Sequence, residues 1–286
     1  MSGAVVIGLY ALRECVRRRV FAVVLLLTVV FLALYGAGTF FAFRELEQSL
    51  RLGTQDLIEE RVVAGSTLFG LAMFSTLFLG AVLAVFLTLG AVRGDDERGL
   101  LAPLVVRPVG RTQFLLGRFG AAATVCAAYV AAVYTVAMVI TGVIGEWWPD
   151  RIVGPGLGMV AGVIVIVAIA LLGSVFLSAT ANGIAVFMIF GAGLTAGLLG
   201  QIGEALGSDT LTEISGIATW MLPFEALYQA GLHGLTADAT GLTGTAVQLG
   251  PFGGAQEASA LLWPWAVAYV AAVGLAARVG FARRDL

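Results

Sequence analysis

Few side chains in this sequence are suited to catalysis or to metal binding. There is one histidine, His233, and two cysteines, Cys15 and Cys126, and all 16 basic residues are arginines. Without lysine the chain can form neither a P-loop, whose lysine contacts the phosphates, nor a Schiff base. The cysteines are not expected to form a disulfide, and with one histidine they give no zinc-binding spacing. We therefore predict no catalytic residue, no metal site and no cofactor bound by this chain.

The most ordered arrangement of charged residues lies between residues 93 and 111. Acidic residues come first, where a short helix would present its positive end. Leucines then recur on one face, and a proline ends the element. This pattern suits docking into a groove of a cytoplasmic partner, and the alternative is an ordinary interfacial loop. The residues assigned to this docking surface are Asp95, Asp96, Glu97, Arg98, Gly99, Leu100, Leu101, Leu104, Arg107, Pro108 and Arg111.

The composition excludes an ordinary soluble domain. Of 286 residues, 59% are hydrophobic and 12% are charged, and the mean hydropathy is +0.98. Soluble domains carry about 25% charged residues. The net charge of −2 gives no reason to expect nucleic acid as a partner. These values indicate a membrane protein that crosses the bilayer several times.

Stretches without charged residues mark the predicted membrane crossings, because a spanning helix needs about 20 mostly apolar residues. The longest stretch has a polar break at 178–182 and is interpreted as two helices. The predicted fold is all-α, with an elbow helix over 1–19 and a six-helix transmembrane domain over 20–286. Its spans lie at about 20–43, 63–92, 115–145, 156–178, 183–200 and 259–279.

The arginines predict the orientation of these spans. With the N-terminus inside, twelve arginines fall on inner segments and four on outer segments. This asymmetry places both termini in the cytoplasm. The loop 93–114 is then cytoplasmic, and segments 44–62 and 201–258 are outside. We expect a multi-pass protein of the inner (plasma) membrane of the cell.

The segment before the first span has the pattern of an amphipathic helix. Apolar residues recur at helical spacing between residues 5 and 16, and the arginines lie off that stripe. We predict an elbow helix that lies along the inner leaflet, in contact with membrane lipid. The alternative is a cytoplasmic extension of the first span. The basic residues of the elbow are Arg13, Arg17, Arg18 and Arg19.

The two outer segments differ in character. Leucines at helical spacing predict a short helix in 44–62, which is either a connector or, less favoured, a docking surface for an extracytoplasmic partner. Within 201–258, residues 217–232 are apolar but interrupted by Pro223 and Glu225, as in a re-entrant or interfacial helix. His233 follows this stretch and is interpreted as a polar cap.

The interiors of the six predicted spans contain no ionisable group. This absence argues against an ion-coupled transporter and against an enzyme that acts within the membrane. The glycines of 154–162 and 191–200 are expected to let helices approach closely, and a lining for a substrate path is the alternative.

The loop residues resemble the signature of a known family. Glu97-x-Gly99-x-Leu101, Leu104, Arg107-Pro108-Val109-Gly110-Arg111 and Phe114-Leu115-Leu116-Gly117-Arg118 are similar to the loop of ABC-2-type permeases. The sequence departs from that signature at Leu100, Gly110 and Arg118, where the family has Thr, Ser and Lys. The elbow, the six spans and the interrupted outer segment fit the same family over nearly the whole chain.

The resemblance implies the membrane subunit of a type V ABC exporter. Two six-helix subunits, most simply a homodimer, would pair above ATP-binding subunits that bind ATP and Mg²⁺. Two other classes of function stay open: a non-transporting scaffold for an extracytoplasmic partner, and a channel without a motor. The uncharged spans favour a lipid-like or hydrophobic substrate over a bare ion.

We predict that cysteines placed at Ser49 and Thr240 react with an impermeant thiol reagent on whole cells. Cysteines at Gly94 and Arg284 should be protected, because the arginine distribution places these positions inside. The reverse labelling pattern would contradict the predicted orientation.

Overall fold

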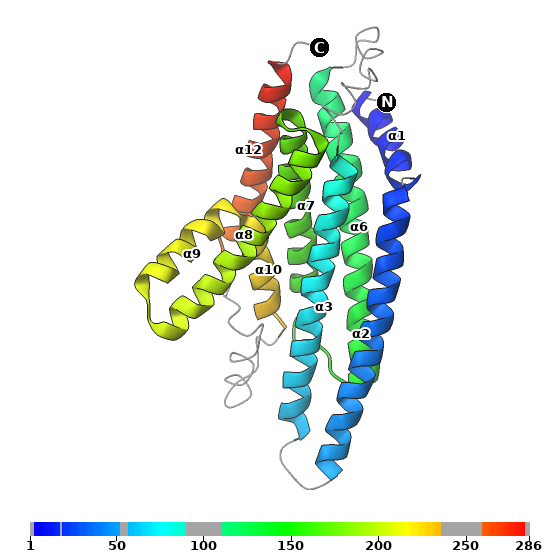
Figure 1. Ribbon diagram of the computed structural model, residues 1–286, viewed down its shortest axis with the longest axis vertical. Coiled ribbons are helices and arrows are strands. Elements are labelled where there is room, and N and C mark those ends of the chain that lie inside the picture. Colours follow the sequence, from blue (N-terminus) through cyan, green and yellow to red (C-terminus); the bar gives the residue numbers. More distant parts are fainter. Residues whose placement is uncertain (1–2, 18, 52–56, 90–109, 236–258, 284–286) are drawn as a thin grey trace.

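The computed structural model describes residues 3–17, 19–51, 57–89, 110–235 and 259–283, and within these ranges every regular element is a helix (Figure 1). In chain order the helices are α1 (Gly3–Arg17), α2 (Arg19–Arg51), α3 (Leu57–Thr88), α6 (Arg111–Gly145), α7 (Val153–Phe176), α8 (Ala179–Leu206), α9 (Asp209–Met221), α10 (Pro223–His233) and α12 (Leu262–Ala282).

Six of these helices are long and apolar enough to cross a membrane, which confirms the predicted all-α fold with six spans. They are α2, α3, α6, α7, α8 and α12. The start of α1 and the end of α12 lie at the same end of the bundle, as an even number of crossings requires (Figure 1). The side of the membrane on which they lie stays a prediction.

The centre of the bundle is formed by α3 and α7. In their most apolar stretches, 61% of α3 and 67% of α7 is buried, against 17% of α2. Phe69 and Leu77 of α3 and Met159 of α7 are fully buried there. Because α7 is buried on nearly all sides, its sequence is apolar around the whole helix and shows no amphipathic stripe.

Hydroxyl pairs join α2 to α6. Thr28 is hydrogen-bonded to Tyr129, and Tyr35 is hydrogen-bonded to Thr141. Thr28 and Thr141 also donate to backbone carbonyls of their own helices, to Val24 and Ala137 respectively. Such bonds are favoured between spanning helices because hydrocarbon offers polar groups no other partner.

The turn between α7 and α8 lies at the predicted polar break. Asn182 is fully buried there, and its Nδ2 atom donates to the carbonyl of Ala170 at 2.9 Å. This side-chain amide therefore links the first turn of α8 to the last turns of α7.

The segment from α8 to α10 folds back on the bundle. α9 returns along α8, and α10 then runs along α7 (Figure 1). The break between α9 and α10 falls at Pro223, which takes the first position of α10, where a proline costs no backbone hydrogen bond. The indole nitrogen of Trp265 in α12 donates to the carbonyl of Trp220 at 2.9 Å and ties α9 to α12.

Glycines of α7 and α8 allow α10 to pack closely against these two spans. A Cβ atom added at Gly158 of α7 would lie 2.8 Å from the carbonyl oxygen of Leu227, and one at Gly162 would lie 3.3 Å from that of Phe224. On α8, a Cβ atom at Gly193 would overlap the Phe224 ring. The expected role of these glycines in close helix packing is therefore seen at α10, whereas Gly154 and Gly191 have open space around them.

We predict that Gly158→Ala lowers the stability of the bundle by about 1–3 kcal/mol, the usual cost of overpacking, because its methyl group displaces the α10 backbone. Gly154→Ala on the same helix is the matched control, since its Cβ meets nothing within 4 Å. The measurement is the thermal unfolding midpoint of both variants in one detergent. Equal midpoints would contradict the role given to the Gly158 contact.

Candidate functional site

The predicted docking surface lies mostly outside the described residues. This holds for Asp95, Asp96, Glu97, Arg98, Gly99, Leu100, Leu101, Leu104, Arg107 and Pro108. Arg111 is the first residue of α6, and the described chain before this surface ends at Leu89, just after α3. The structure therefore shows which two helices the loop joins: the end of α3 and the start of α6.

The start of α6 is packed against α1 along much of the length of α1. Gly8 of α1 faces the backbone of Gly117 of α6, where an added Cβ would lie 3.8 Å from the Gly117 carbonyl oxygen. Arg118 Nη1 donates to Glu14 Oε2 at 3.0 Å, and the Arg118 guanidinium lies 5.5 Å from the centroid of the Phe114 ring. The α1–α6 junction, as we call this contact of Gly8, Glu14, Gly117 and Arg118, makes the elbow and the base of α6 one packed unit.

The arginines predicted for the elbow are not part of that junction. Arg13, Arg17 and Arg19 are exposed, and Arg18 lies outside the described residues. Tyr10, Arg13, Glu14 and Arg17 line a hollow of about 480 Å³. Exposed cations beside an apolar helix suit anionic headgroups or an acidic partner surface. The location of α1 along the inner leaflet stays a prediction.

A second polar site lies on α10, which carries a buried carboxyl group. Glu225 is 4% exposed, and its Oε1 atom accepts a hydrogen bond from Gln229 Nε2 at 2.8 Å. Its Oε2 atom, the Tyr228 hydroxyl and Gln229 Oε1 are buried without a hydrogen-bond partner among the described residues. The carboxyl group lies directly against the backbone of Gly197 in α8. A neutral carboxyl group fits this interface better than a charged one.

The surroundings of Glu225 offer it no cation. α7 contains no titratable side chain, and α12 has Tyr269 and Arg278, of which Arg278 lies more than four turns from the start of α12. α9 carries Asp209 and Glu213, both exposed, and α8 carries Glu204 two turns beyond Gly197. Burial therefore raises the pKa of Glu225 to about 7, and the hydrogen bond from Gln229 opposes the rise. Burial, and then the charge of Glu225, raises the pKa of Tyr228.

Sequence reasoning placed Glu225 in a broken outer segment and did not identify it as a buried group. The available signal was its spacing from Tyr228 and Gln229, since residues three and four apart share one face of a helix. The spacing alone does not tell whether that face meets water or Gly197 of α8. The Glu14–Arg118 pair has no local signal, because its members are 104 residues apart.

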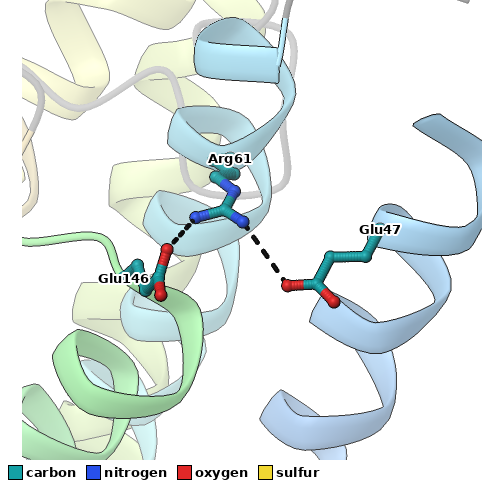
Figure 2. A network of polar contacts seen from close by, with 3 residues as sticks. All are labelled: Glu47, Arg61 and Glu146. Atoms are coloured by element: carbon teal, nitrogen blue, oxygen red, sulfur yellow. Dashed lines mark hydrogen bonds and ion pairs between the residues drawn. The ribbon is translucent and has the colours of Figure 1, made fainter. Parts of the chain in front are cut away.

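One arginine joins the end of α2, the start of α3 and the end of α6. Figure 2 shows Arg61 of α3 between two carboxylates, with Nη1 2.7 Å from Glu146 Oε2 and Nη2 3.5 Å from Glu47 Oε1. Glu146 ends α6 in the left-handed region, with φ of 49°, which is uncommon for a residue other than glycine. This network links these ends of three spans.

Within the described ranges, no group of three or more His, Cys, Asp or Glu side chains could hold a metal ion. Cys15 and Cys126 are both buried, and no disulfide joins them.

The Glu225 carboxyl group makes the packing of α10 dependent on pH. Its ordinary pKa is near 4.5, and the packed state raises this pKa to about 7, so the packed state binds the proton more tightly than the open state. The contribution of protonated Glu225 is fully present below about pH 4.5. This contribution is lost as the pH rises to about 7, a change of about 3 kcal/mol in the free energy of packing.

We predict that the thermal unfolding midpoint decreases as the pH is raised from about 5 to about 8. Glu225→Gln should remove most of this decrease. Glu213→Gln, on the exposed face of α9, is the control and should keep the wild-type pH profile. An unchanged profile in Glu225→Gln would show that other groups cause the dependence.

Comparison with protein families matches residues 10–286 to the family described as ABC-2 family transporter protein. A comparison with curated proteins gave no match. The family match begins at Tyr10 within the elbow and includes all six spans and the loop between α3 and α6. This chain is therefore a multi-pass membrane protein that belongs to the ABC-2 transporter family, whose members are permease components that generally work with an ATP-binding subunit.

Proposed function

We propose that this chain is the permease subunit of an ABC exporter of the inner (plasma) membrane, driven through the loop 93–111. The observation that carries the proposal is the α1–α6 junction. It fixes the elbow to the helix that begins at Arg111, where the loop ends. A push on the loop would thus be applied to a unit of two helices, which transmits force better than a free connector.

The motor in this proposal is a separate chain that binds ATP and Mg²⁺ and hydrolyses the nucleotide. The loop would insert its apolar face, Leu100, Leu101 and Leu104, into a groove of that chain, with Glu97 beside a basic contact. Closure of two such motors around ATP would tilt the spans and change the side to which the substrate path opens.

A second copy of this chain is the proposed partner within the membrane. The apolar face of α2 is largely free in one subunit, and 33% of the most apolar stretch of α8 is buried. Large exposed residues along α2 include Leu26, Leu34 and Phe41. α3 is mostly covered within its own subunit, so we assign the interface to α2 and α8.

We further propose that the transporter exports its substrate rather than taking it up, and that the substrate is lipid-like or hydrophobic. The uncharged interiors of the spans support such a substrate, because no described span offers a charge to coordinate an ion at its centre. The alternatives are a scaffold for an extracytoplasmic partner and a channel without a motor.

We predict that Glu97→Arg and Leu101→Asp abolish most of the stimulation of the ATPase partner while membrane abundance is unchanged. Glu97→Arg opposes a basic contact, and loss of a desolvated charge contact costs about 2–5 kcal/mol. Leu101→Asp places an unpaired carboxylate in an apolar groove. The charge reversal Glu213→Arg on exposed α9 is the control.

The measurement is purification from native membranes, with a co-purifying P-loop ATPase identified by mass spectrometry and its activity assayed with each variant. Normal assembly and full stimulation in both variants would refute coupling through this loop. Purification with an extracytoplasmic protein and no ATPase would favour the scaffold, and purification with neither would favour the channel.

A further inference from the structure

A groove on the lipid-facing side of the bundle has the features of a phospholipid site. It encloses about 400 Å³ between α6, α7 and α12, near the end of the bundle where α6 begins and α12 ends (Figure 1). Its walls are mostly apolar and include Leu116 and Phe119 of α6 and Leu171 of α7. All three helices are membrane spans, so the apolar occupant available at this depth is a lipid acyl chain.

The groove remains open because α12 has no side chain at one position. A Cβ atom added at Gly274 would meet nothing within 4 Å, and Gly274 lines the groove. Below it, Ala277 and Phe281 of α12 pack with Phe114 and Val175 in a small separate core. In its most apolar stretch only 22% of α12 is buried. An acyl chain in the groove would therefore complete the packing of α12 against α6 and α7.

One end of the groove is polar and positive. Arg278 and Thr112 line it there, and Arg278 is the only charged residue among the described lining residues. Arg278 is exposed and makes no ion pair within the described part of the chain. Thr112 is in the first turn of α6, whose N-terminus has no side-chain cap and so adds positive partial charge at the same end. Basic pockets between spanning helices bind anionic headgroups.

We propose that this groove binds one anionic phospholipid, with an acyl chain along Leu116, Phe119 and Leu171 and the phosphate beside Arg278. The predicted orientation would make it a lipid of the inner leaflet. Lipid binding in the groove requires neither that orientation nor an ATPase partner. A negative result in the lipid-binding test would therefore leave the proposed transport function untouched, and the reverse also holds.

The test uses the purified full chain equilibrated with equimolar phosphatidylglycerol and phosphatidylcholine, with retained lipid counted by native mass spectrometry. We expect wild type to retain phosphatidylglycerol in preference. Arg278→Gln should reduce that preference about fivefold, which is the effect on affinity expected from the loss of one cation near an anionic headgroup. Gly274→Phe should abolish it by filling the groove, and Gly274→Leu provides a smaller filling side chain if the yield falls.

Matched controls separate the groove from general lipid contact. Gly191→Phe on α8 adds the same ring where a Cβ also meets open space, and Arg283→Gln removes an exposed cation just beyond α12 that does not line the groove. Both should keep the wild-type preference. Equal retention of the two lipids by wild type, or an unchanged preference in Gly274→Phe and Gly274→Leu, would overturn the proposal.

Discussion

Close approach of helix backbones at glycine is the constraint on which this fold depends. Within a bilayer, apolar side chains gain little by leaving lipid for protein, so spanning helices associate through tight packing and hydrogen bonds. At Gly158 and Gly162, α7 presents bare backbone to α10, where an added Cβ atom would lie 2.8 Å and 3.3 Å from carbonyl oxygens of α10. The contact between Gly8 of α1 and Gly117 of α6 is looser, since a Cβ atom added at Gly8 would lie 3.8 Å from the Gly117 carbonyl oxygen, and the ion pair of Glu14 with Arg118 reinforces it.

These contacts form a continuous packed route through the subunit. α1 is packed on α6, α6 is packed on α3 and α7, and α7 carries α10. In the proposed mechanism, a displacement of the base of α6 reaches the outer half of the bundle by this route, without a flexible segment among the described residues. Glu225 lies at the far end of the route, against the backbone of Gly197 in α8, where we expect its protonation to strengthen the packing of α10.

The sequence predicted the six spans because length and apolar content alone decide whether a helix can cross a bilayer. The break at Asn182 and the interruption at Pro223 were also visible, since each acts locally. The burial of Glu225 was not, because it depends on which helix covers one face of α10. The partnership of Glu14 with Arg118 depends likewise on how α1 crosses α6. The docking residues between 95 and 108 lie outside the described residues, so their role stays a prediction from the sequence.

We propose that the elbow and the base of α6 move as one unit when the motor works. Exchanging the charges at the α1–α6 junction tests this coupling, through the ATPase stimulation of Glu14→Arg, of Arg118→Glu and of the double variant. Each single variant places like charges together and should lose stimulation, and the double variant should regain most of it. Normal stimulation in both single variants, or stimulation as low in the double variant as in the single ones, would show that the two helices do not move as one unit.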